Sequence, residues 1–162
     1  MRLTMTIAGL TVDAERQGAV LVLESDEGPH LAIAIGMVEA AAIARELQGT
    51  RFPRPLTHDL LRDVVRTLSA ELEAVEIVDL RDDTYYAELV LRDAAGVEQR
   101  LDARPSDAIA LAVRLEAPIR VDSKVLARAD PEAQEIAAPT DKEGWKRRLR
   151  EMDPGDFGKY KM

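Results

Sequence analysis

The chain has 162 residues and a formal net charge of −8, and it contains no cysteine. Hydrophobic residues make up 46% of it and aromatic residues only 4%, which suits one globular domain with an aliphatic core. The missing cysteines exclude disulfides, thiolate catalysis and Cys-ligated zinc. The acidic balance disfavours tight sequence-independent DNA binding, which needs many Lys and Arg side chains against phosphates, but leaves room for a local arginine cluster.

The first part of the chain predicts a strand meander followed by a helix. Residues 3–12, 19–25 and 31–36 carry alternating or continuous apolar side chains between turn signals, which is typical of strands. Residues 39–48 have apolar side chains at helical spacing and precede Gly49, a common helix stop. There is no secretory signal pattern and no apolar run near the length of a membrane span, so we expect a soluble cytoplasmic protein.

A proline-bounded loop leads into the second part, which begins with another helix. This helix starts at Thr57 and carries one apolar stripe. Three strands, a third helix and a last strand follow, at residues 74–82, 84–93, 98–104, 107–116 and 117–126. The order predicts an α+β fold over residues 1–129, with a mixed or antiparallel sheet of about seven strands in two meanders and three main helices.

The two meanders end in similar segments. Residues 35–49 align without gaps to residues 103–117, and in this alignment Glu39 corresponds to Asp107. One interpretation is an internal pseudo-repeat, in which the two helices start at equivalent positions. The alternative is that two alanine-rich helices merely use small residues to pack closely on a sheet.

Residues 130–162 form a separate region in the predicted organisation. A proline-punctuated linker precedes a segment in which Thr140 and Glu143 can form a capping box, so a short C-terminal helix is expected around Trp145. One hypothesis is that this helix docks its Trp on the body or on a partner. The other is that its Lys and Arg residues form a basic arm that touches nucleic acid.

The stretch "LDARPSDAIALAVR", residues 101–114, places polar chemistry at the start of an apolar helix. Helix capping explains Pro105 and Ser106, and the helix dipole favours Asp107, by about 0.3–1 kcal/mol. Neither needs Asp102 or Arg104. If a strand ends here, alternation sends both side chains to one face, where they either pair or form one edge of a phosphate or metal site.

The stretch "RPLTHDLL", residues 54–61, repeats this arrangement. Thr57 suits the N-cap, and Asp59 suits the positive end of the helix dipole. His58 is less easily explained, because a helix N-terminus disfavours a cation and so favours the neutral imidazole, which can act as a general base. The chain has no HExxH, P-loop, GxGxxG or GxSxG pattern, so the corresponding enzyme classes lack their signatures.

These motifs together resemble the bifunctional nuclease family. The resemblance is carried by "IGMVEAAAIARELQG", "RPLTHDLL", "YYAELVL", "LDARPSDAIALAVRLEAPIRV" and a final "DPGDF", and it covers residues 1–130 plus the tail motif. It implies an α+β domain that is often homo-oligomeric, with nuclease activity on DNA and RNA described for plant members. The family's motif positions fall on Glu39, His58, Asp59, Asp102, Arg104, Ser106 and Asp107.

The resemblance favours a phosphodiesterase that uses Mg²⁺ or Mn²⁺ to activate water on nucleic acid. The predicted metal ligands are Glu39, Asp102 and Asp107; the predicted catalytic residues are His58, Asp59, Asp102, Arg104 and Asp107; the predicted substrate-binding residues are Arg54, Arg104 and Ser106. We expect Asp102, Arg104 and at least one of the other helix-start residues to line one concave surface.

The competing hypothesis is a non-catalytic regulatory or interaction domain. In that case the polar helix starts would bind a small anion or a protein partner, or form a subunit interface. The acidic charge and the lack of a dense metal motif favour this alternative. Under either hypothesis, small-residue helices and the Trp145 segment predict a homodimer or higher closed oligomer.

Overall fold

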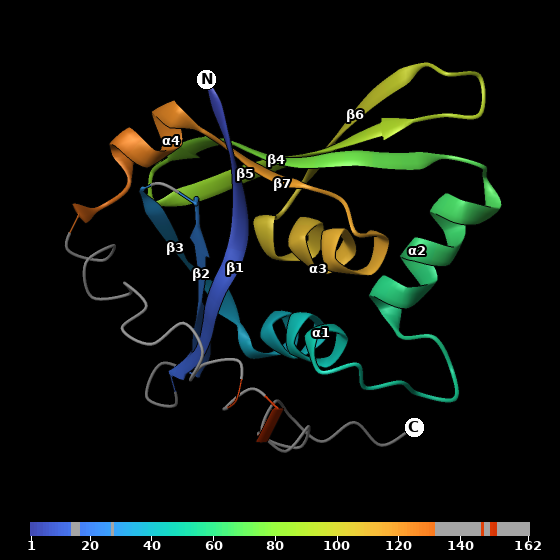
Figure 1. Ribbon diagram of the computed structural model, residues 1–162, viewed down its shortest axis with the longest axis horizontal. Coiled ribbons are helices and arrows are strands. Elements are labelled where there is room, and N and C mark those ends of the chain that lie inside the picture. Colours follow the sequence, from blue (N-terminus) through green and yellow to red (C-terminus); the bar gives the residue numbers. More distant parts are fainter. Residues whose placement is uncertain (14–16, 27, 132–146, 148–149, 152–162) are drawn as a thin grey trace.

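The computed structural model describes residues 1–13, 17–26, 28–131, 147 and 150–151. Its seven strands form one mixed sheet with the order β3-β2-β1-β7-β4-β5-β6 (Figure 1). The strands are β1 Arg2–Asp13, β2 Gly18–Glu24, β3 His30–Gly36, β4 Glu71–Arg81, β5 Thr84–Arg92, β6 Glu98–Ala103 and β7 Ile119–Asp122. The predicted α+β class with two strand meanders is therefore confirmed.

The short strand β7 joins the two meanders. It pairs antiparallel to β1 of the first meander and parallel to β4 of the second. All other neighbouring pairs are antiparallel. The last strands of the two meanders, β3 and β6, are the two edges of the sheet. Each edge strand runs directly into a helix.

The sheet is joined by three 11-residue helices, α1 Met37–Leu47, α2 Thr57–Thr67 and α3 Pro105–Leu115, of which α1 and α3 contribute to the hydrophobic core. Helix α3 lies in the middle, where it contacts α1, α2, β4 and β5 (Figure 1). Its residues Ala108–Ala112 are at most 1% exposed, and its alanines allow neighbouring backbones to approach closely. In the described residues, no helix is long and apolar enough to span a membrane.

The predicted last strand, residues 117–126, is only partly correct. The strand covers Ile119–Asp122, and the chain then forms the short helix α4, Ser123–Arg128. The Asp122 carboxylate accepts a hydrogen bond from the Lys124 N–H, which caps this helix and ends the strand. Most of the predicted C-terminal helix, Trp145 included, lies outside the described residues.

The element order agrees with the predicted pseudo-repeat. Strand β3 leads into α1 and strand β6 into α3, and each helix has 11 residues. Glu39 and Asp107 are both the third residue of their helix. The two acids therefore start from equivalent positions, while superposition of the two backbones stays a prediction.

A cluster of arginines, which the acidic composition did not exclude, lies on the sheet around Glu76. Glu76 of β4 alternates with the core residues Val75 and Ile77, and it is only 1% exposed. Its carboxylate oxygens lie 3.0 Å from Nη1 of Arg2, 2.8 Å from Nη1 of Arg100 and 3.6 Å from Nη1 of Arg120. Buried acids require such partners, because an unpaired charge in the core is costly.

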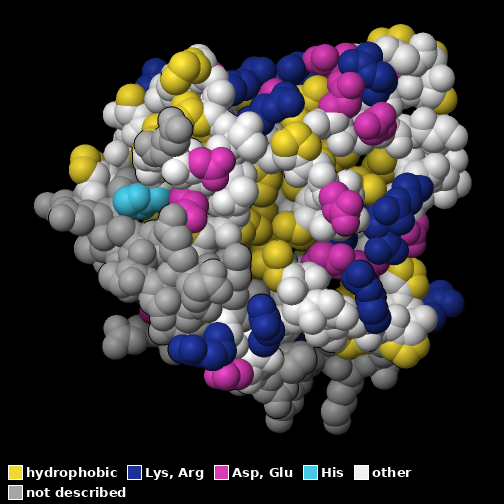
Figure 2. All heavy atoms as spheres, in the orientation of Figure 1, with side chains coloured by type: hydrophobic (Ala, Val, Ile, Leu, Met, Phe, Trp, Pro, Cys, Tyr) yellow, Lys and Arg dark blue, Asp and Glu magenta, His cyan; other side chains and the backbone are white. Residues whose placement is uncertain are grey.

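Helix α2 leaves most of its apolar stripe uncovered. Val65 is buried, but Leu60 is 55%, Val64 44% and Leu68 67% exposed. Figure 2 shows that hydrophobic side chains also reach the surface elsewhere, between charged ones. Contiguous exposed apolar side chains of this kind are a common mark of a protein–protein contact.

We expect the chain to form a homodimer through this stripe. Wild-type protein at micromolar concentration should show twice the chain mass in light scattering, and Leu60→Glu should shift it towards the monomer because a charge would be buried in the contact. Arg66→Glu, on the opposite side of α2 by helical spacing, is the matched control. A monomeric wild-type mass across this range would contradict the expectation.

Candidate functional site

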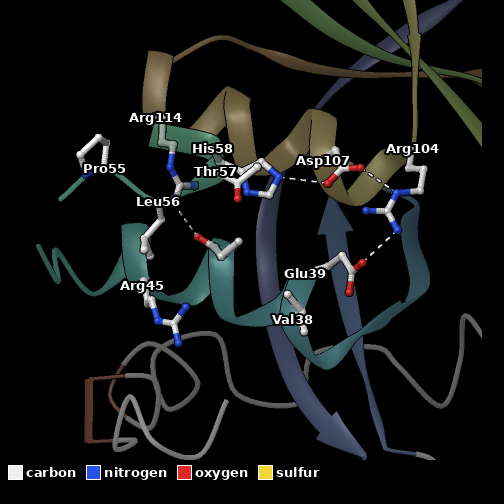
Figure 3. Close-up of a pocket in the computed structure, with 11 residues that line it drawn as sticks. Val38, Glu39, Arg45, Pro55, Leu56, Thr57, His58, Arg104, Asp107 and Arg114 are labelled. Atoms are coloured by element: carbon white, nitrogen blue, oxygen red, sulfur yellow. Dashed lines mark hydrogen bonds and ion pairs between the residues drawn. The ribbon is translucent and has the colours of Figure 1, made fainter. Parts of the chain in front are cut away.

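The starts of α1, α2 and α3 surround one pocket of about 430 Å³. Four of its lining residues are Glu39 from α1, His58 from α2, and Arg104 and Asp107 from the start of α3 (Figure 3). The three helix starts are far apart in the chain. Packing of α1 and α2 against α3 brings them together.

A chain of hydrogen bonds links these four side chains. His58 Nε2 lies 3.0 Å from Asp107 Oδ1, and Arg104 Nε donates to Asp107 Oδ2 at 2.7 Å. Arg104 Nη1 donates to Glu39 Oε1 at 2.9 Å, so the guanidinium bridges the acids at the third positions of α1 and α3 (Figure 3). The Arg104 side chain is 64% exposed, whereas that of His58 is 15% exposed.

The environment keeps Asp107 ionised. Burial alone would raise the pKa of its carboxyl group, but hydrogen bonds from Arg104 and His58 outweigh burial and lower the pKa below its usual value. An ionised Asp107 can hold the His58 ring in a fixed orientation. Asp59 lies at the start of α2 but does not line the pocket. Burial likewise opposes its ionisation, and hydrogen bonds from Arg114 and the Leu56 N–H lower its pKa overall.

A glycine gives Glu39 its position. Gly36 is the N-cap of α1, and a Cβ at this position would overlap the Glu39 carboxylate. The backbone at Gly36 has φ −72°, which any residue can adopt, so the constraint is space rather than backbone conformation. The missing side chain lets Glu39 fold back towards Arg104.

Arg114 is the buried support beneath the pocket, and the sequence reasoning missed it. Its side chain is 2% exposed, and its Nε donates to Asp59 Oδ1 at 2.7 Å. Nη1 donates to the Ala110 carbonyl at 2.7 Å and Nη2 to the Ala42 carbonyl at 3.0 Å. One guanidinium thus joins all three helices. A single charge inside the apolar run "AIALAVRL" was the available signal.

A second missed residue, Arg45, also lines the pocket. It is 4% exposed, and its guanidinium carbon lies 5.5 Å from the centre of the Phe52 ring. Like Arg114, it is a charged residue in an otherwise alanine-rich helix. Such isolated charges among core positions indicate buried partners.

Asp59, one of the predicted catalytic residues, makes two contacts that stabilise the fold. One carboxylate oxygen accepts from Arg114, and the other accepts from the Leu56 N–H at 3.0 Å, which caps α2. Asp59 does not line the pocket, and both of its oxygens hold the fold together through these bonds. The sequence predicted an acid at the start of this helix correctly, but it did not reveal the buried arginine that pairs with this acid.

Asp102 does not join the common surface, which corrects the expectation that it lies beside Arg104. Strand β6 ends at Ala103, so alternation along the strand does not continue to Arg104, the N-cap of α3. Asp102 is exposed on the sheet, opposite Glu88 of β5. Arg54 is exposed in the loop before α2 and does not line the pocket. Ser106 is 7% exposed and lines a neighbouring pocket instead.

The residues present do not fit the Mg²⁺ or Mn²⁺ that the resemblance implies. Of the three predicted ligands, Asp102 lies apart, and Glu39 and Asp107 both already bind the guanidinium of Arg104. Among the residues that the structure describes, no three His, Asp or Glu side chains come together as a metal site. A hard cation needs several free oxygen ligands, and here a positive side chain occupies them.

The buried ion pair predicts a pH-dependent stability. Asp59→Asn should lower the free energy of unfolding at pH 7 by about 3 kcal/mol, because Arg114 keeps a buried charge without its partner. Since folding lowers the pKa of Asp59, its stabilisation exists above the ordinary carboxyl pKa of about 4 and is lost as the pH falls through the lower folded value. Urea unfolding followed by circular dichroism should show the wild-type advantage shrinking below that pH.

Asp63→Asn is the control for this measurement. Asp63 also pairs with an arginine on α2, but its side chain is 45% exposed, so the loss should stay below about 1 kcal/mol. A difference between wild type and Asp59→Asn that stays constant from pH 7 to pH 3 would contradict the assigned ion pair.

Gly36→Ala should change the site without unfolding the protein. The new Cβ displaces the Glu39 carboxylate, so the Glu39–Arg104 pair is lost, while stability changes by less than about 1 kcal/mol because that pair is solvent-exposed. A crystal structure of the variant and its melting temperature test both parts. Gly28→Ala, where a Cβ has room, is the control. Retention of the pair in the variant would show that Gly36 does not position Glu39.

The sequence of the chain is similar to those of known proteins. Residues 21–141 match the family model for the bifunctional nuclease domain. The chain is 40% identical over 160 residues to an uncharacterized protein of Mycobacterium tuberculosis. The aligned residues cover 93% of this chain and 95% of the relative.

Plant relatives match over a shorter stretch. Bifunctional nuclease 1 of Oryza sativa subsp. indica is 29% identical over 109 residues, 65% of this chain and 33% of the plant protein. Bifunctional nuclease 2 of Arabidopsis thaliana is 29% identical over 116 residues, 69% of this chain and 35% of the plant protein. The match over three quarters of the chain and the mycobacterial relative establish that this chain belongs to the bifunctional nuclease domain family.

Proposed function

We propose that the chain hydrolyses phosphodiester bonds of nucleic acid at the cluster of Glu39, His58, Arg104 and Asp107. The observation that carries the proposal is the position of Arg104, an exposed guanidinium held between two acids beside a histidine. The names of the plant relatives, which are nucleases, agree with this chemistry. The mycobacterial relative carries no functional name.

Arg104 is the group that binds the phosphate in this proposal. Its Nε and Nη1 are held by Asp107 and Glu39, and within the described chain no hydrogen bond is found for Nη2. A guanidinium that is fixed on one side can donate from its open edge to phosphate oxygens. It would also stabilise the charge that develops on those oxygens in the transition state.

His58 is the group that moves a proton. Its Nε2 is bonded to Asp107, which leaves Nδ1 as the nitrogen that can accept one. In the proposed step Nδ1 takes a proton from the attacking water, the water oxygen bonds to phosphorus, and the ester P–O bond breaks. The leaving oxygen gains a proton from solvent or from the imidazolium. Asp107 orients the ring throughout, as an acid does in other histidine dyads.

The predicted Mg²⁺ or Mn²⁺ plays no part in this scheme, because the acids that would bind it are occupied by Arg104. The net charge of −8 also predicts that contacts with nucleic acid are few and local. Location in the cytoplasm remains a proposal that agrees with the composition.

The alternative, a non-catalytic interaction domain, is favoured by one specific observation. The exposed apolar residues Leu60, Val64 and Leu68 on α2 suit a protein partner or a second copy of the chain. In that case the Arg104 site would bind a small anion without changing it. Measured turnover, rather than binding, separates the two functions.

Arg104→Ala should lower the rate of polynucleotide cleavage by more than tenfold. The melting temperature should barely change, because Arg104 is 64% exposed and its ion pairs are solvent-screened. Cleavage by wild-type protein should persist in EDTA, since no step uses a metal ion. The assay follows single-stranded DNA and RNA of defined length on gels.

Arg92→Ala is the matched control for this assay. Arg92 is 42% exposed and bonded to Glu73, away from the pocket, so its loss should leave cleavage unchanged. Equal cleavage by the two folded variants would show that Arg104 takes no part in the reaction. If Arg104→Ala unfolds the protein and the rate per folded molecule is unchanged, Arg104 is only a structural partner. Abolition by EDTA would overturn the metal-free scheme.

A further inference from the structure

A second pocket of about 420 Å³ adjoins the first. It lies between the edge strand β3, the turn from β4 to β5 and the start of α3, and its lining includes Ala34, Thr84, Tyr85 and Ser106. Glu39 and Arg104 line both pockets. Arg104 therefore stands at the boundary between two hollows of nearly equal size.

The second pocket carries polar groups that the proposed chemistry does not use. Ser106 is 7% exposed, and no hydrogen bond is found for its hydroxyl in the part of the chain that the structure describes. Tyr85 is partly buried, and its hydroxyl lies 3.5 Å from the Ala32 carbonyl, which holds the ring against β3. A buried hydroxyl beside a fixed aromatic ring is suited to a ligand with both polar edges and a flat face.

We propose that the site binds a single strand with one nucleoside in each pocket and the phosphodiester between them on Arg104. This inference rests on the proposed function and adds how the substrate lies. The nucleoside on one side contacts Val38 and Leu56 in the first pocket, and its neighbour contacts Tyr85 and Ser106 in the second. The bond to be broken then lies beside His58.

Size favours a single strand over a duplex. Pockets that hold drug-sized ligands measure roughly 300–1,000 Å³, and 420 and 430 Å³ lie near the lower end. Each pocket therefore suits one nucleoside rather than a base pair. Two neighbouring nucleosides can enter separate pockets only when they are unstacked from each other, which a single strand permits more easily than a duplex.

Charge favours a short contact. The acids Glu39, Asp83 and Asp107 surround Arg104 at the two pockets, so phosphates farther along the strand meet no continuous basic track there. Proteins that follow a long single strand use a positively charged groove together with stacking side chains. Here Arg104, whose side chain is exposed while Arg45 and Arg114 are buried, and Tyr85 supply these two elements for a dinucleotide unit.

Binding of small ligands tests the arrangement directly. The probes are the phosphorothioate of a thymidine dinucleotide, which resists hydrolysis, and thymidine 3′- and 5′-monophosphate, each titrated into the full chain by calorimetry. The dinucleotide should bind at least tenfold more tightly than either monophosphate. Ala34→Phe fills the second pocket from an exposed position on β3, and it should bring the dinucleotide Kd within threefold of the tighter monophosphate.

Thr11→Phe is the matched control. Thr11 of β1 pairs with Val20, which pairs with Ala34, so Thr11 lies in the same cross-strand row two strands away and lines neither pocket. It is also exposed, and its substitution should leave every Kd unchanged. Equal affinities for dinucleotide and monophosphates, or full dinucleotide affinity in folded Ala34→Phe, would overturn the two-pocket arrangement.

Cleavage measured in parallel separates this inference from the proposed function. If Ala34→Phe cleaves polynucleotide as wild type does while Arg104→Ala does not, the two-pocket arrangement fails and the nuclease proposal stands. If the dinucleotide binds as expected but no polynucleotide is cleaved, the binding arrangement stands and hydrolysis fails. Absence of binding by every probe at millimolar concentration would overturn the two-pocket arrangement, and loss of the Arg104-dependent cleavage as well would overturn hydrolysis.

Discussion

The ion pair between Arg114 and Asp59 is the contact on which the site depends. Its guanidinium reaches one acid at the start of α2 and one backbone carbonyl each in α1 and α3. Because the Arg114 guanidinium is buried and each of its nitrogens has a partner, the three helices cannot shift independently without leaving its charge unpaired. The helix starts that present Glu39, His58 and Asp107 are fixed relative to each other as a consequence.

The equivalent starts of α1 and α3 place one acid on each side of Arg104. Glu39 and Asp107 occupy the same position in two helices that each follow the last strand of a meander. Two acids brought close together repel each other, and Arg104 offsets this repulsion by binding both. Only the α3 side has the histidine contact, through Asp107, so the pair is chemically asymmetric. That asymmetry gives one acid an orienting role and the other a role in holding Arg104.

Local sequence patterns were sufficient for most of the fold and for part of the site. Apolar periodicity placed the strands and helices, and helix-start chemistry singled out Glu39, His58, Arg104 and Asp107, which do share one pocket. The prediction that Asp102 lies beside Arg104 was wrong because strand alternation cannot show where a strand ends. The contact of Asp59 with Arg114 could not be predicted, because the two residues lie 55 positions apart and only tertiary packing brings them together. Buried partners of this kind leave no local signature beyond an isolated charge in an apolar helix.

The most direct test of the account is where nucleic acid contacts the folded chain. A short single-stranded oligonucleotide titrated into isotope-labelled protein should shift the NMR signals of the Arg104 Nε–H group and the His58 ring first. The signals of Arg2, Arg100 and Arg120, which surround Glu76 on the sheet, should stay nearly unchanged. Shifts confined to those three arginines, with Arg104 and His58 unaffected, would contradict the assignment of the site.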